Sequence, residues 1–262
     1  MSTPYRTIDE VVRRFAAREA RYRGMSDRRS IFLTLYGIVS EEMRSRLEQR
    51  FFTDNEWVHR YAVAFANLYR EALDQYDEGR PNDVPKAWRL CFDAAKAGNG
   101  LVLQDMFLGV NAHVNNDLPL ALVAVSIEPD RLLRQKDHAA VNAVLGAITD
   151  RATQRVAALY APGLTAMDAA AGQLDEMLSL FSLQVARDSA WESAVSLSSA
   201  GSAAERALVA SLISSRAAVM ARLLLAPSLD PLLVAACKRL EQGSKWTTIL
   251  AAAASAARTK RT

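Results

Sequence analysis

Apolar residues recur at helical spacing along almost the whole chain. In the first predicted helix they stand at Ile8, Val11, Val12, Phe15 and Tyr22. Residues 31–47 and 58–72 repeat this periodicity. Because an α-helix has about 3.6 residues per turn, such spacing places the apolar side chains on one face. Alternating patterns beside a hairpin turn, which are typical of strands, are nearly absent. The pattern therefore predicts an all-α protein.

Three capping boxes predict where helices begin. A Ser or Thr followed three residues later by Glu occurs at Thr7 to Glu10, Thr53 to Glu56 and Ser202 to Glu205. In this motif the first side chain accepts a hydrogen bond from the backbone one turn later, and the Glu reaches back. Further helices are predicted near residues 101–116, 137–160, 165–197, 202–225 and 231–257.

The helix predicted over residues 101–116 is interrupted by Asp117 and Pro119. Asp is a favourable N-cap, and Pro is tolerated in the first turn of a helix. We therefore predict a single-domain bundle of about eight or nine helices over residues 1–257, with the central helix broken near Asp117–Pro119. Residues 258–262 are predicted to be a disordered basic tail.

Composition and charge narrow the class of protein. The chain has 262 residues, half of them apolar, and a formal net charge of only +3. The basic residues are interspersed with acidic ones, so we expect no nucleic-acid partner. The longest apolar stretch, residues 118–127, is about ten residues, whereas a membrane span needs roughly 20. With no signal-peptide core and only two distant cysteines, Cys91 and Cys237, we expect a cytoplasmic protein without a membrane partner.

Motifs of several common chemistries are absent from the sequence. It contains no G-x-S-x-G, no G-x-x-x-x-G-K-[ST] and no G-x-G-x-x-G, so it predicts neither a nucleophile elbow nor a phosphate cradle. H-E-x-x-H, cysteine clusters and EF-hand loops are also absent. No metal site or particular cofactor is predicted from motifs. The sequence leaves open a small-molecule ligand and a homodimer.

One polar segment, Asn111 to Pro119, stands within an apolar setting. It contains His113 and Asp117 together with Asn111, Asn115 and Asn116. At 100° per residue, His113 and Asp117 lie about 40° apart on a helix and can interact. We infer that this helix runs through the middle of the bundle with its polar groups directed inward. Gly109, just before it, would allow a neighbouring helix or a ligand to approach closely.

Three interpretations of this segment remain open. In a structural one, His113 and Asp117 bond to backbone at the helix break, and Asp117 caps the next helix. In a catalytic one, Asp117 orients His113, which acts as a general acid/base in a helix-lined pocket. In a third, both bind a metal, which needs a further ligand from Asp105, His59 or His138.

The same segment resembles a known family. Residues 109–119, G-V-N-A-H-V-N-N-D-L-P, are similar to the signature G-[IV]-N-A-H-[IV]-N-x-D-L-P of a bacterial domain of unknown function (five-nine-nine-five). Further similarities are Asp27-Arg28-Arg29, Phe52-x-Asp54-x-x-Trp57, Pro85-x-Ala87-Trp88 and Ala186-Arg187-x-x-Ala190-Trp191. The resemblance implies a small helical protein, with some members tied to specialised metabolism. It also implies a role for His113 and Asp117 without naming a reaction.

Several companion residues have both a structural and a functional interpretation. Arg187 and Trp191 stand four residues apart on one predicted helix and could stack. Arg187 would either hold an anionic substrate or pair with Asp117 or another carboxylate. The aromatic side chains of Trp57, Trp88 and Tyr36 are expected in the core.

The leading hypothesis is an enzyme that acts on a small organic metabolite. Its predicted catalytic residues are His113 and Asp117, and its predicted substrate-binding residues are Asn111, Asn115, Asn116, Arg187 and Trp191. The alternatives are a non-catalytic module for an apolar ligand, a packing or oligomerisation protein, and a metal-dependent enzyme. An exposed apolar face on the helices of residues 202–257 would favour oligomerisation.

Overall fold

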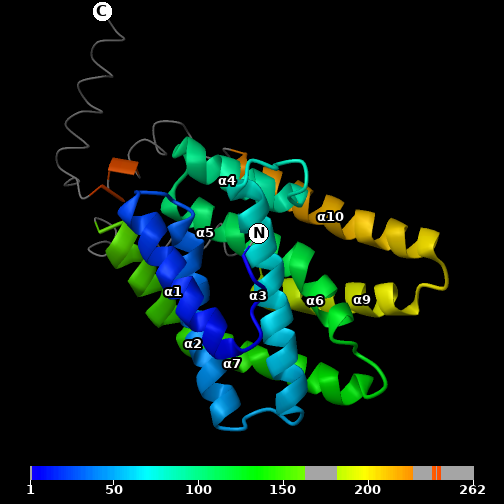
Figure 1. The fold of residues 1–262 in the computed structure, drawn as a ribbon. Helices are drawn as coiled ribbons and strands as arrows, with labels where there is room; N and C mark the ends of the chain where they lie inside the picture. Colours follow the sequence, from blue (N-terminus) through cyan, green and yellow to red (C-terminus); the bar gives the residue numbers. More distant parts are fainter. Residues whose placement is uncertain (1, 163–181, 227–237, 240, 243–262) are drawn as a thin grey trace, which may run out of the picture.

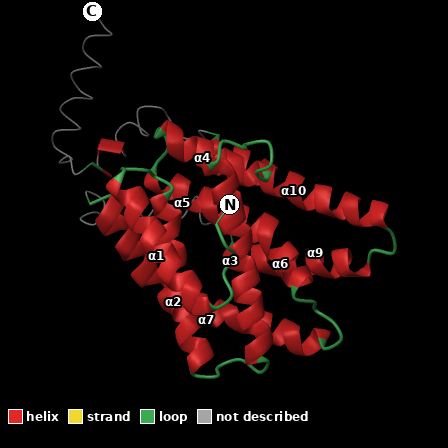
Figure 2. Ribbon diagram, viewed as in Figure 1, coloured by secondary structure: helices red, strands yellow, loops and turns green. Residues whose placement is uncertain are grey.

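The chain is all-α in the computed structural model, which describes residues 2–162, 182–226, 238–239 and 241–242. No strand occurs in these residues (Figures 1 and 2). The helices are α1 (Ile8–Gly24), α2 (Ser30–Glu48), α3 (Asn55–Asp77), α4 (Lys86–Ala97), α5 (Val102–Asn111), the π-helix η1 (Ala112–Asp117), α6 (Leu118–Ala124), α7 (Arg131–Tyr160), α9 (Leu183–Ser199) and α10 (Ala203–Leu225). The predicted all-α bundle is confirmed. The tail at 258–262 and the predicted helix at 231–257 fall almost wholly outside the described residues.

Two of the three predicted helix starts are confirmed, and the third is shifted by one residue. Thr7 caps α1 by accepting from the Glu10 amide, and Ser202 caps α10 by accepting from the Glu205 amide. The cap of α3 is Asp54, which accepts from the Trp57 amide at 2.9 Å, so the prediction of Thr53 was wrong.

A buried carboxylate explains this shift. The backbone amides of Thr53 and Asp54 both donate to Asp137 on α7, at 2.9 and 2.6 Å. These two bonds hold the chain so that Asp54, and not Thr53, stands at the start of α3.

The run α5–η1–α6 passes through the middle of the bundle. It packs against α2, α3, α4, α9 and α10, whereas α1 lies outside it against α2 and α3. Figure 1 shows α9 and α10 as an antiparallel pair joined by a short turn on the side opposite α1 and α2. The predicted central position of this helix is therefore confirmed.

The interruption near Asp117 has a different form from the one predicted. The helix does not stop there, because Asp117 has helical dihedral angles (φ −84°, ψ −34°) and its side chain caps nothing. The chain widens instead into η1, in which the Leu118 amide donates to the His113 carbonyl five residues earlier. Pro119 explains the change, since it has no N–H and its ring clashes with the carbonyl four residues before it. The predicted N-cap role of Asp117 was wrong.

The core confirms the inward direction of the polar segment. Asn111, His113, Asn116 and Asp117 are all buried. A Cβ added at Gly109 would stand 2.5 Å from the Phe32 ring of α2, so Gly109 allows this helix to approach. The predicted core aromatics Trp57, Trp88 and Tyr36 are also buried.

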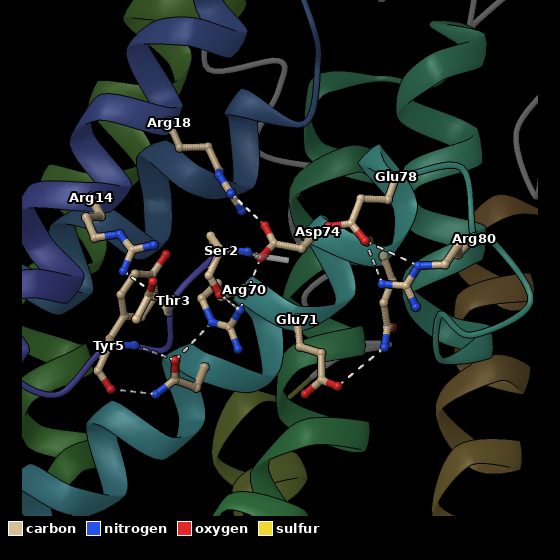
Figure 3. A network of polar contacts seen from close by, with 12 residues as sticks. Ser2, Thr3, Tyr5, Arg14, Arg18, Arg70, Glu71, Asp74, Glu78 and Arg80 are labelled. Atoms are coloured by element: carbon tan, nitrogen blue, oxygen red, sulfur yellow. Dashed lines mark hydrogen bonds and ion pairs between the residues drawn. The ribbon is translucent and has the colours of Figure 1, made fainter.

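The N-terminal segment is fastened to α3 by a buried carboxylate (Figure 3). The amide and hydroxyl of Ser2 donate to Asp74 Oδ2 at 2.7 and 2.6 Å. Arg18 of α1 reaches the other oxygen of Asp74 at 2.7 Å, and Arg70 lies 3.1 Å from Oδ2. One side chain thus joins three separate parts of the fold.

Helix α10 carries an exposed apolar face, formed by Leu208, Leu212, Val219 and Leu223. It is the one helix of the described part that is long and apolar enough to cross a membrane, with a mean hydropathy of 1.6 over its most apolar window and 28% of that window buried. The core helix of a soluble protein can have the same length and composition. The length of its apolar stretches did not indicate a possible membrane span, because Arg216 and Arg222 interrupt them.

Candidate functional site

The predicted pair of His113 and Asp117 is formed on η1. His113 Nδ1 lies 3.0 Å from Asp117 Oδ2, and both side chains are buried. The same oxygen accepts from Trp88 Nε1 at 2.7 Å, and Oδ1 accepts from Asn116 Nδ2 at 2.8 Å. Three donors from η1 and α4 therefore hold the carboxylate in one position.

The surroundings of His113 favour a neutral imidazole. Burial lowers its pKa from 6.5, and the bond to Asp117 opposes this shift only in part. A neutral imidazole carries one proton, and the adjacent carboxylate assigns that proton to Nδ1. The lone pair is then on Nε2.

Nε2 of His113 is a buried polar atom without a hydrogen-bond partner among the described residues. Most buried polar atoms in proteins are satisfied, so an orphaned one calls for an explanation. The imidazole also lines a cavity. A polar atom of a bound molecule would supply the missing partner.

Aromatic rings fix the orientation of the imidazole. Phe65 of α3 stacks on it with ring centroids 3.5 Å apart and an angle of 5° between the planes. Tyr36 of α2 approaches edge-on at 4.4 Å, and Phe32 lies at 5.7 Å. With Nδ1 held by Asp117, these contacts leave the ring little freedom to turn.

The cavity beside His113 has a volume of about 480 Å³. This lies within the range of roughly 300–1,000 Å³ that is usual for small-molecule sites. Its wall is formed by α2, α3, α5, η1, α7 and α9 with Ile8 of α1, and it consists mainly of aliphatic and aromatic side chains. The hydroxyls of Ser40 and Thr149 bond to backbone carbonyls of their own helices. The cavity is therefore suited to a largely apolar molecule.

Arg187 of α9 contributes the charged group in the cavity wall. Its side chain is 3% exposed, and it donates from Nε to Asn142 Oδ1 and from Nη2 to the His138 carbonyl, both at 2.7 Å. It forms no ion pair within the described ranges, so the predicted pairing with Asp117 or another carboxylate was wrong there. The packing of the helices explains this difference, because it directs the guanidinium at α7.

The other predicted residues lie around the cavity and not in its wall. Asn111 donates to the Ala217 carbonyl of α10 at 2.9 Å, and Asn115 donates to Asn111 at 2.8 Å. Asn116 supports Asp117, and the Trp191 ring lies against His138. Of the predicted site residues, the structure brings His113 and Arg187 to the cavity. A substrate-binding role for the others stays a prediction.

Each residue predicted as a possible third metal ligand contacts another group of the protein. Asp105 pairs with Arg28, His59 accepts from the Ile8 amide, and His138 contacts Tyr61 and Arg187. Within the described residues, no group of three His, Cys, Asp or Glu side chains is placed to hold a metal ion.

Sequence reasoning missed Phe65 and Tyr61 as residues of the site. They stand four residues apart on α3, so their spacing predicts only that they share one apolar face. Every buried helix has such a face. Their spacing gives no sign that a cavity lies beside that face.

Comparison with known proteins gives one match. The chain matches the family described as "Family of unknown function (DUF5995)" over residues 8–227. No curated protein and no solved structure matches it.

Proposed function

The chain belongs to the family of unknown function DUF5995, and from this premise we propose that it is an enzyme using His113 as a general base on a largely apolar small molecule. One observation carries the proposal. The buried Nε2 of His113 has no hydrogen-bond partner in the described chain, and its ring lines a cavity of about 480 Å³.

The surroundings of His113 suit proton abstraction. A neutral imidazole whose Nδ1 proton is held by a carboxylate presents its Nε2 lone pair to the substrate. When Nε2 takes a proton, the ring becomes cationic, and Asp117 at 3.0 Å stabilises the new charge. In an apolar cavity this attraction is stronger than in water. Trp88 and Asn116 keep the carboxylate in place while the charge changes.

The apolar wall favours a second candidate, a non-catalytic protein that binds an apolar ligand. In this case the cavity would hold the ligand unchanged, and His113 Nε2 would only accept a hydrogen bond from it. The two candidates differ in whether the bound molecule is converted.

The test is a conversion screen with matched variants. Purified protein is incubated with a library of apolar esters, ketones, phenols and organic acids, and the products are followed by mass spectrometry. We expect His113→Asn to lower the rate of conversion by about 100-fold or more, the usual contribution of a positioned general base, while ligand binding persists. His59→Asn is the control, because His59 does not line the cavity, and it should convert at the wild-type rate.

Two results would contradict the proposal. One is equal conversion by the His113→Asn variant and the wild-type protein. The other is binding of library compounds with no conversion of any of them, which would support the non-catalytic candidate.

A further inference from the structure

The charge of Arg187 is not balanced by any Asp or Glu of the described residues. Its side chain is 3% exposed, and its two hydrogen-bond acceptors at 2.7 Å, an amide oxygen and a backbone carbonyl, are both neutral. No Asp or Glu of the described residues lies within ion-pair distance of it. Proteins seldom bury a charge without a partner, because removing it from water is costly.

The described groups that face Arg187 from other helices do not supply a negative charge. Tyr61 of α3 and Arg187 both approach His138 Nδ1, at 3.3 and 3.5 Å. Burial, and next the positive charge of Arg187, lower the pKa of His138 to about 3, so this histidine is neutral near pH 7. Burial likewise raises the pKa of the Tyr61 hydroxyl, which stays protonated.

We infer that the cavity binds an organic monocarboxylate, with the carboxylate paired to Arg187 and an apolar body against the remaining wall. A guanidinium presents a planar set of donors that matches a carboxylate. Among the described residues of the wall, Arg187 is the only Lys or Arg, so the site provides one positive charge. This favours a monoanion over a phosphate ester, which carries close to two negative charges near neutral pH.

The positions of the two polar groups define the substrate further. Tyr61, which approaches the same His138 nitrogen as Arg187, stacks on Phe65 with centroids 6.2 Å apart, and Phe65 stacks on His113. A molecule that spans both groups therefore has its carboxylate several atoms from the position that His113 acts on. This inference rests on the proposed function, since it takes the cavity to be the substrate site.

The test compares acids with alcohols of equal length. Isothermal titration is carried out with hexanoate, octanoate and decanoate and with the corresponding 1-alkanols. A hydrogen bond between two charged groups is stronger than one to a neutral hydroxyl, so we expect the wild-type protein to bind at least one acid about ten-fold more tightly than its alcohol. In Arg187→Gln this preference should fall to about two-fold or less, and Arg187→Lys should restore part of it.

Arg134→Gln is the matched control. Arg134 is a buried arginine of α7 that donates to the Ser126 carbonyl and lies outside the cavity wall, so this variant should keep the full preference. A purely structural role of Arg187 would weaken acids and alcohols alike and leave their ratio unchanged. That result would overturn the inference, as would equal affinities in the wild-type protein or no binding of any acid.

A His113→Asn variant separates this inference from the proposed function. It should retain the acid preference, because His113 does not carry the charge. If acids are preferred but nothing is converted, the enzyme proposal fails and the carboxylate site stands. If neutral substrates are converted but acids and alcohols bind equally well, the carboxylate site fails and the enzyme proposal stands.

Discussion

At the scale of single residues, two buried histidines make the stability of the fold depend on pH. Burial lowers the pKa of His113, and it lowers that of His138 to about 3. Both rings stay neutral in the folded protein at pH values where an unfolded histidine, with a pKa near 6.5, takes up a proton. Their neutrality follows from their position in the fold and not from their neighbours in the sequence.

We therefore predict that these two histidines lower the stability as the pH falls below about 6.5. In this range the unfolded chain binds protons that the folded chain does not, so the free energy of unfolding decreases with decreasing pH. Each histidine contributes about 1.4 kcal/mol per pH unit between its unfolded and folded pKa values, and for His138 this range extends to about pH 3. Above pH 6.5 neither contributes a slope.

Urea unfolding at pH 7.0, 6.0 and 5.0 measures this slope. Because carboxylates also titrate in acid, the informative quantity is the difference between the wild-type protein and a His138→Gln variant. The variant should lose less stability between pH 6.0 and 5.0. An identical slope in both proteins would mean that His138 is protonated in the folded state.

At the scale of elements, the start of α3 shows how tertiary contacts select a cap. Both Thr53 and Asp54 are favourable capping residues. Asp137 on α7 accepts from both of their amides and so decides that Asp54 faces the open end of the helix. The π-helix η1 has a more local cause, since Pro119 disturbs the α-helical hydrogen bonds one turn before it.

We predict that Asp54→Ala lowers the free energy of unfolding by about 1 kcal/mol, the usual value of an N-cap side chain. Thr53→Ala is the matched control and should change it by less than about 0.5 kcal/mol, because the bond from Thr53 to Asp137 uses the backbone. Chemical denaturation of the two variants measures both values. If Thr53→Ala lowered the free energy of unfolding more than Asp54→Ala, Thr53 and not Asp54 would be the N-cap residue.

At the scale of the whole molecule, Asp74 joins parts of the chain that are distant in sequence. It accepts from Ser2, from Arg18 on α1 and from Arg70 on its own helix (Figure 3). These bonds outweigh the effect of burial and lower the pKa of its carboxyl group. The N-terminal segment, α1 and α3 are thus held by one buried charge.

Replacing Asp74 should be among the most damaging changes in the described chain. We predict that Asp74→Ala lowers the free energy of unfolding by about 3–5 kcal/mol, because it leaves the partly buried Arg18 and the buried Arg70 without a carboxylate. The control is Asp9→Ala, whose exposed pair with Arg44 at 3.7 Å should contribute under about 1 kcal/mol. Thermal and urea unfolding compare the two. Similar losses would show that the Asp74 bonds do not stabilise the fold.

The sequence alone determined the features that depend on contacts within one or two helical turns. These are the helices, two of the three predicted caps, and the pairing of His113 with Asp117, which stand four residues apart. The family could also be recognised from the segment around this pair, and the family match confirms that the chain belongs to it. Spacing along a helix is enough for such features, because the geometry of the helix brings the residues together.

Only the tertiary structure decided what surrounds the pair. It brought Trp88 of α4 to Asp117, placed Phe65 of α3 on the imidazole, directed Arg187 at α7 and left a cavity between α2, α3, α7 and α9. These contacts join residues tens of positions apart, and they depend on how the helices pack. A helical pattern specifies which face of each helix is apolar, but many arrangements bury such faces equally well. The choice among them, and with it the cavity and its charge, arises only when the side chains of all the helices are packed together.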